Sequence, residues 1–259
     1  MICSVGHKFL APEDSICWAQ DAINELDQLI TEFFKGDIAK IVTEFDSKTG
    51  ENVQKLKFLA DIPKNFRRKA TEALISAKHS FDQTIFTACN VISPRPISRV
   101  NYPWSQSPTD LDRLLTKRGV NPEIWDTIRK HQPYPTSDSH SGGDDLIRTL
   151  ATIANNKHTI GLSVNGQIES IRFPDIRGGI TQSMKILSPI WNPQKNEAEL
   201  IKWIGDVKID GDYNFAFKIC LKDSRLSKPV DVIHALRVFT NKANEVCKTL
   251  KSKCLELAA

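Results

Sequence analysis

The chain has 259 residues, of which 40% are hydrophobic, enough to bury a substantial core in one large domain or two closely packed ones. Its 35 basic and 31 acidic residues give a formal net charge of +4, too small to indicate nucleic-acid binding by itself. The six cysteines form no C-x-x-C pair, which favours a reducing cytoplasm over a disulfide framework. No apolar run approaches the roughly 18 residues of a membrane helix, so we expect neither export nor a membrane partner.

The first predicted element is a long helix over residues 12–35. Pro12 lies near its start, Glu13 and Asp14 lie in its first turn, and Gly36 ends it. Its apolar stripe recurs at helical spacing: Ile16, Ala19, Ile23, Leu26, Ile30 and Phe33. The following stretch, IAKIVTEFDSKTGENVQKLKFLADIP, has two β-rich runs around a turn-like DSKTG, which predicts a hairpin.

A second long helix is predicted from Asn65, taken as its N-cap, to the prolines at positions 94 and 96. Its inward stripe comprises Ala70, Leu74, Ala77, Phe81, Ile85 and Ala88. A proline-rich connector over residues 93–107 follows. Three shorter helices then begin at the capping patterns Ser107-Pro108-Thr109-Asp110, Asn121-Pro122-Glu123 and Ser141-Gly142-Gly143-Asp144.

Beyond residue 157 the hydrophobic period changes from helical to alternating. Asn165-Gly166 predicts a hairpin turn, and the runs ELIKWIGDVKID and YNFAFKICLK, separated by GD, predict another hairpin. A final helix is expected from Pro229, with a regular apolar stripe of Val232, Leu236, Phe239, Ala243, Val246 and Leu250.

These elements predict an α+β fold with an N-terminal mainly helical layer that carries one β-hairpin, a C-terminal antiparallel sheet and a closing C-terminal helix. Residues 1–157 form the helical part and residues 158–259 the β part with the last helix. The two parts are expected either as separate units or as one compact domain.

The junction ATIANNKHTIG supplies the first candidate site residues. Lys157 and His158 lie at a helix end. They either complement the helix dipole and bond the last carbonyls, or they take part in catalysis or ligand binding. In the functional interpretation His158 acts as a proton donor or acceptor, and Lys157 with Arg148 holds an anion.

His79 and Asp82 lie three residues apart on the second long helix, so their side chains share one face. The pair either fastens this helix to a neighbour or orients an imidazole for catalysis. The run Arg67-Arg68-Lys69 occupies the first turn, where the helix dipole disfavours cations; it is either a solvated charge run or a phosphate seat. The histidine spacing favours no metal ion, and no cofactor motif is present.

Four segments of the chain, ALISAKHSFDQTIF, YPW, IRKHQPY and LIRTLATIANNKHTIGL, follow one another in the order of a known motif set. Residues 65–165 thereby resemble a family of bacterial and phage proteins with L-R-x-A-L-D-H, Q-P-Y and N-x-x-K-H-R type motifs and no established activity. Asp82 matches the first motif, Gln132-Pro133-Tyr134 the second, and Asn155, Lys157 and His158 the last. The resemblance implies a shared architecture and a polar cluster in which Asp82 meets Lys157 and His158.

The chain departs from these motifs at three positions, where Lys78, Gln83 and Thr159 replace arginine, histidine and arginine. Helical RNA-cleaving domains of bacterial defence systems also differ from this chain. They separate an arginine and a histidine by four to six residues, whereas Arg148 precedes His158 by ten positions.

Three function hypotheses follow. The leading one is a soluble cytoplasmic protein of prokaryotic or phage type that binds an anionic ligand, a nucleotide or a nucleic-acid backbone, through Arg67, Arg68 and Lys69. The second is a metal-independent hydrolase or nuclease in which His158 or His79 transfers protons, with Asp82 beside them and Lys157 or Arg148 on the developing charge. The third is a scaffold that forms homo-oligomers through its first and last helices.

Overall fold

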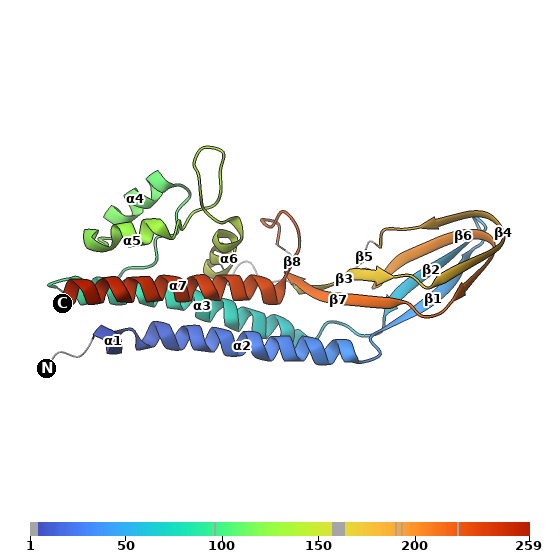
Figure 1. Cartoon of the computed structure of the whole chain (residues 1–259), viewed down its shortest axis with the longest axis horizontal. Helices are drawn as coiled ribbons and strands as arrows, with labels where there is room; N and C mark the ends of the chain where they lie inside the picture. Colours follow the sequence, from blue (N-terminus) through green and yellow to red (C-terminus); the bar gives the residue numbers. More distant parts are fainter. Residues whose placement is uncertain (1–4, 96, 157–163, 190, 193, 222) are drawn as a thin grey trace. The chain divides into compact units, whose positions relative to one another are not determined.

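The computed structural model describes residues 5–95, 97–156, 164–189, 191–192, 194–221 and 223–259. The helices are α1 (Val5–Lys8), α2 (Leu10–Lys35), α3 (Lys64–Ile92), α4 (Pro108–Lys117), the 3₁₀ turn η1 (Pro122–Ile124), α5 (Trp125–Lys130), α6 (Asp145–Asn155) and α7 (Val232–Ala258). The strands are β1 (Ala39–Asp46), β2 (Glu51–Phe58), β3 (Val164–Arg172), β4 (Asp175–Ile186), β5 (Trp191–Asn192), β6 (Glu197–Asp210), β7 (Asn214–Leu221) and β8 (Val230–Asp231). The fold is α+β, with early helices, later antiparallel strands and a closing helix, as predicted (Figure 1).

The chain divides into two compact units, each built from separate stretches of sequence. The first unit comprises Met1–Asp27, Asn65–Val164 and Leu221–Ala259, and the second comprises Gln28–Lys64 and Asn165–Cys220. These units differ from the expected division into residues 1–157 and 158–259. The early hairpin joins the later strands in one sheet, whereas the last helix belongs with the early helices.

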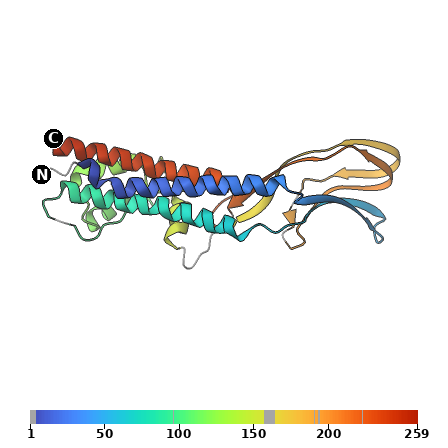
Figure 2. The same ribbon diagram turned by 90° about the horizontal axis from the view of Figure 1, so that it is seen from below.

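Three long helices, α2, α3 and α7, lie side by side in the first unit (Figure 2). Polar contacts along α2 show that it runs antiparallel to both partners: Ser15 with Gln83 and Glu25 with Lys69 on α3, and Glu13 with Lys251 and Asp27 with Arg237 on α7. The helices α3 and α7 are therefore parallel to each other, which places their middle turns together.

The apolar stripes of these helices form the core of the first unit. The inward residues predicted for α3 and α7 are all buried, as are Ile16, Ala19, Ile23 and Leu26 of α2. The stripes that suggested contact with a second copy are thus covered within one chain. In the described part of the chain, no helix combines the length and the apolar character needed to cross a membrane.

The shorter helices begin at the predicted caps. Ser107 Oγ accepts from the N–H of Asp110 at 3.1 Å, and Asp144 Oδ1 accepts from the N–H of Ile147 at 2.8 Å, which satisfies a free donor at each helix start. The cap predicted for α3 is wrong, because this helix already begins at Lys64 and takes Asn65 into its first turn. Because of this earlier start, Arg67 ends the first turn, and Arg68 and Lys69 lie in the second turn rather than in the first, as had been expected.

The second unit contains an antiparallel sheet of strand order β1-β2-β6-β4, with β5 also paired to β6, while β3 lies beside β7. The predicted β1–β2 hairpin is confirmed, with Ala39 opposite Phe58 and Asp46 opposite Glu51. Its turn places Gly50 at φ 70°, a left-handed conformation that glycine adopts without a steric cost. Leu56, Leu200, Ile201 and Trp203 form the core of this unit, and the aromatic residues of β7 pack against it.

Two predicted hairpins are wrong. Asn165 and Gly166 lie within β3, so the pairing of this strand overrides their turn preference. The strands β6 and β7 are consecutive but belong to different sheets. β6 pairs with β2 through residues 197–203 on one edge and with β4 and β5 on the other, whereas β7 pairs with β3.

Candidate functional site

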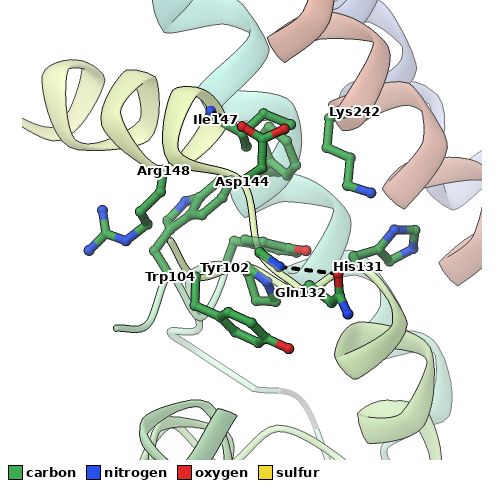
Figure 3. Close-up of a pocket in the computed structure, with 12 residues that line it drawn as sticks. Tyr102, Trp104, His131, Gln132, Asp144, Ile147, Arg148 and Lys242 are labelled. Atoms are coloured by element: carbon green, nitrogen blue, oxygen red, sulfur yellow. Dashed lines mark hydrogen bonds between the residues drawn. The ribbon is translucent and has the colours of Figure 1, made fainter. Parts of the chain in front are cut away.

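A pocket of about 230 Å³ lies within the first unit and is lined by aromatic, polar and charged side chains, which makes it the candidate site. It is bounded by the aromatic segment 102–104, the loop 131–134, the start of α6 and one residue of α7; we name it the Tyr102 pocket (Figure 3). Its polar and charged lining residues are Tyr102, Trp104, His131, Gln132, Tyr134, Asp144, Arg148 and Lys242. Phe81 and Ile147 complete the apolar part of the wall.

The floor of the pocket is a cluster of packed aromatic rings. The ring centroid of Phe81 lies 5.0 Å from that of Tyr102, 4.8 Å from that of Trp104 and 5.2 Å from that of Phe239. Such edge-to-face and tilted pairs stabilise a core beyond the area they bury. In this floor, Tyr102 and Trp104 both pack against Phe81.

Side chains from α3, from α6 and from the C-cap of α4 hold the aromatic segment in place. Asp82 Oδ1 of α3 accepts from the N–H of Tyr102 at 3.1 Å. Arg118 Nη1 donates to the carbonyl oxygen of Tyr102 at 2.6 Å, and Arg148 Nε of α6 donates to that of Ser105 at 2.9 Å. A segment without regular structure thus has its backbone groups paired.

The loop over residues 131–134 approaches the start of α6 closely. Gln132 has φ 48°, a left-handed conformation that is uncommon outside glycine, and its Oε1 accepts from the N–H of Gly143 at 3.2 Å (Figure 3). The carbonyl of Tyr134 accepts from the N–H of Asp144 at 2.9 Å. A Cβ on Gly143 would lie 2.6 Å from the carbonyl oxygens of Tyr134 and Pro135, so this position requires glycine.

Trp104 contributes a buried donor to the pocket wall. Its side chain is 9% exposed, and its Nε1–H has no acceptor among the residues that the structure describes. A buried N–H without an acceptor costs about 1–3 kcal/mol relative to a paired one. A ligand oxygen or a water molecule at this donor would remove that cost.

A charged cluster on α7 borders the pocket at His131. Lys242 Nζ pairs with Glu245 Oε2 at 3.1 Å, and Glu245 Oε1 lies 3.4 Å from His131 Nδ1. His131 Nε2 is 2.6 Å from Thr249 Oγ1. In Figure 3 the side chain of Lys242 extends from α7 toward the side of the pocket that His131 occupies.

Burial and neighbouring charges shift the protonation of two of these groups. Burial, and then the carboxylate of Glu245, raise the pKa of the Tyr102 phenol, which therefore stays protonated at neutral pH. Burial, and then the positive charge of Lys242, lower the pKa of His131, against an opposing effect of Glu245. Near neutral pH His131 is consequently uncharged.

A second depression, which we name the α5–α7 groove, measures about 870 Å³ and lies between η1 and α5 on one side and α7 on the other. His131 lines both the groove and the Tyr102 pocket. Glu245 and Thr249 face the groove, whereas Lys242 faces the pocket. The imidazole is therefore the side chain that separates the two depressions.

The structure brings only part of the predicted site together. Arg148 lines the Tyr102 pocket, although its guanidinium points away from the other labelled side chains and also donates to Thr152 (Figure 3). Asp82 lies behind the pocket, where its carboxylate binds the N–H of Tyr102 and the ammonium of Lys78. Lys157 and His158 lie outside the described residues, so the expected meeting of Asp82 with them is not described.

The remaining candidates lie elsewhere on α3. His79 is exposed and does not line the pocket. Lys69 is ion-paired with Glu25 at 2.6 Å and with Glu72 at 3.1 Å, hydrogen bonds that raise its pKa. Its charge therefore helps to fasten α3 to α2 (Figure 1).

Arg67 and Arg68, the other two cations of the predicted phosphate seat, are exposed to solvent on the first two turns of α3. In the described ranges, no group of three or more histidine, cysteine, aspartate or glutamate side chains is arranged to hold a metal ion.

Several residues of the pocket were not predicted as site residues. The segments Tyr102–Trp104 and Gln132–Tyr134 were noted only as motif matches, and Asp144 only as a helix cap. A signal for them exists in the sequence, because both segments combine aromatic residues with proline outside regular structure. Lys242 has no such signal, since it is one lysine among several on an amphipathic helix.

Comparison of this chain with protein-family models, with curated proteins and with solved structures finds no match in any of the three.

Proposed function

We propose that this protein binds a phosphate group of a small ligand in the Tyr102 pocket. The observation that carries the proposal is the ammonium of Lys242 in the wall of a pocket that is otherwise lined largely by aromatic and uncharged polar side chains. Asp144 is the carboxylate of the same wall, but one of its oxygens is engaged as the cap of α6.

The unpaired donor of Trp104 supports the same ligand class. A phosphate oxygen accepts hydrogen bonds in several directions, and both Trp104 and Lys242, which carry an indole N–H and an ammonium, line the pocket. Its binding would pair a buried donor that has no acceptor among the described residues. Contacts with charged groups contribute about 1.5–3 kcal/mol each, more than a neutral hydrogen bond does.

The size of the pocket limits what lies inside it. Its volume of about 230 Å³ is smaller than the roughly 300–1,000 Å³ of pockets that enclose a drug-sized ligand. One phosphate group and the atoms next to it fit, while the rest of a nucleotide or an oligonucleotide would extend outside. Inorganic phosphate, a nucleotide and an oligonucleotide therefore share the group that this pocket would recognise, the phosphate.

The position of His131 favours binding over acid–base catalysis. Both of its ring nitrogens face α7, one toward Thr249 and the other toward Glu245, rather than a ligand in the pocket. A general base has to reach the proton that it removes, at about 2.6–3.2 Å. The hydrolase hypothesis, with His79 or His158 as the base, has no support from the described residues.

Isothermal titration calorimetry with inorganic phosphate, adenosine monophosphate and a short single-stranded oligonucleotide tests the proposal. Lys242→Gln and Trp104→Phe should each weaken binding about ten-fold or more, since each removes a donor to the anion. Arg68→Gln is the matched control, because this exposed cation lies on α3 away from the pocket.

Each outcome of this titration has a separate meaning. Equal affinity for all three ligands would show that the phosphate alone is recognised, and tighter binding of one would identify the source. No binding of any ligand, or a loss caused by Arg68→Gln and not by Lys242→Gln, would contradict the proposal. The second result would point to the first two turns of α3 instead.

A further inference from the structure

The hydrogen bonds around His131 determine which of its nitrogens carries the proton. Thr249 Oγ1 lies 3.0 Å from the carbonyl oxygen of Glu245 and 3.1 Å from that of Val246, and its single hydrogen points to these acceptors. It therefore accepts from His131, whose Nε2 is the protonated nitrogen at 2.6 Å. In the neutral ring, Nδ1 carries a lone pair.

This lone pair faces a carboxylate. His131 Nδ1 lies 3.4 Å from Glu245 Oε1, so two acceptors oppose each other when the ring is neutral. A second proton on Nδ1 would turn this opposition into a charge-assisted hydrogen bond. His131 Nδ1 is thus placed to take up one proton, which it would share in a hydrogen bond with Glu245.

The other charged groups around the ring belong to the two depressions that it lines. On the pocket side they are Lys242, Asp144 and Arg148, together with the phenol of Tyr102. On the groove side they are Glu245, Lys130, Lys248 and Glu123. Of the remaining groove charges, Asp126 pairs with Arg129, and Lys253 pairs with Glu256. Among these charged groups, Lys242 lowers the pKa of the His131 imidazole and Glu245 raises it.

We infer that the Tyr102 pocket takes up a proton at His131 together with its anion, an inference that rests on the proposed function. In the empty pocket, burial and the ammonium of Lys242 oppose a charge on the ring. An anion beside Lys242 offsets that ammonium, and the protonated ring attracts both the anion and Glu245. By linkage, the anion raises the affinity for the proton as much as the proton raises the affinity for the anion.

The direction of the pH dependence follows from this linkage. The pKa of His131 is lowered in the empty pocket and returns toward its usual value when an anion is bound. Anion binding is weakest at pH values above the pKa that His131 has in the anion-bound protein. It tightens as the pH falls through the interval between that pKa and the lower pKa of the empty pocket, and is constant below it.

Calorimetric titration with sulfate, whose charge does not change in this interval, tests the inference. From about pH 7.5 to about pH 5.5, the sulfate affinity of the unmodified protein should rise about three-fold or more. His131→Gln keeps a donor to Thr249 and cannot titrate, so its affinity should be independent of pH. His234→Gln, which changes an exposed histidine of α7, should behave like the unmodified protein.

A second measurement does not depend on a bound anion. Nuclear magnetic resonance of the His131 ring in the empty protein should show a lower pKa in Glu245→Gln and a higher pKa in Lys242→Gln. An unchanged pKa in both variants, or a pH dependence of sulfate binding that persists in His131→Gln, would overturn the proton site alone. Absence of sulfate binding at both pH values would instead overturn the proposed function, and the link between proton and anion with it.

Discussion

Asp82 Oδ1 accepts a hydrogen bond of 3.1 Å from the backbone N–H of Tyr102, a residue that is 2% exposed. The bond joins the middle of α3 to the aromatic segment that forms the floor of the Tyr102 pocket. The same carboxylate also binds the ammonium of Lys78, one turn earlier on the helix. Asp82 therefore acts as a positioning residue behind the pocket, where it fixes the backbone that presents Tyr102 and Trp104.

Asp82→Ala should lower the free energy of unfolding by about 1–3 kcal/mol, because the buried N–H of Tyr102 loses its acceptor. Asp82→Asn retains an oxygen at this position and should cost less. Urea unfolding followed by tryptophan fluorescence measures both variants. An equal loss in the two would show that the bond to Tyr102 contributes nothing beyond the charge of Asp82.

Gly143→Ala should destabilise the protein more than Gly119→Ala. Both glycines have positive φ, 91° and 63°, so both substitutions carry the cost of a left-handed alanine, about 1–2 kcal/mol. Only at Gly143 would the new Cβ also approach two backbone carbonyl oxygens to 2.6 Å, whereas nothing lies within 4 Å at Gly119. Thermal unfolding of the two variants compares them directly, and similar losses would argue against the tight approach of the loop to α6.

Phe81→Ala should cost about 3–5 kcal/mol, as expected for a fully buried aromatic residue that leaves a cavity. Three rings of the pocket floor would lose their common neighbour, so ligand binding should weaken as well. Phe86→Ala is the control on the same helix, since Phe86 is 40% exposed and should change the stability by roughly 0.5 kcal/mol or less. Denaturant unfolding that ranks the two equally would contradict the packing described for α3.

The stability of the protein should fall as the pH is lowered below about 6.5, the ordinary pKa of histidine. The lowered pKa of His131 means that the unfolded chain binds a proton before the folded protein does. The contribution of His131 is therefore complete above the unfolded pKa and is lost, by about 1.4 kcal/mol per pH unit, until the folded pKa is reached.

Urea unfolding between about pH 7.5 and about pH 5.5 checks this slope. In His131→Gln the slope should become flatter, while His234→Gln should leave it unchanged, because His234 is exposed on α7. If the unmodified protein and His131→Gln lose stability in parallel, other groups account for the acid sensitivity.

Local sequence signals predicted most of the elements. The hydrophobic stripes of α2, α3 and α7, the caps at Ser107 and Asp144, and the β1–β2 hairpin depend on residues a few positions apart. The capping hydrogen bonds, for example, join a side chain to a backbone N–H three residues later. Such interactions can be inferred without knowledge of the rest of the chain.

Strand pairing and the candidate site were predicted less well. The turn preference of Asn165-Gly166 and the nearness of β6 and β7 in sequence both favoured hairpins, yet each strand pairs with a distant partner. For the site, Arg148 was predicted and does line the pocket, whereas Trp104, His131 and Lys242 were not. Their proximity results from the packing of α3, α6 and α7 on the two loops, which no local pattern encodes.

The sequence by itself thus determined the α+β class, the positions of the long helices and the faces that they bury, because periodicity and capping are properties of neighbouring residues. Only the tertiary structure decided that the early hairpin joins the later strands and that His131 lies between Lys242 on the pocket side and Glu245 and Thr249 on the groove side. Those contacts join residues more than a hundred positions apart. Their formation depends on the shared burial of whole helices and strands, a property of the folded chain rather than of any segment.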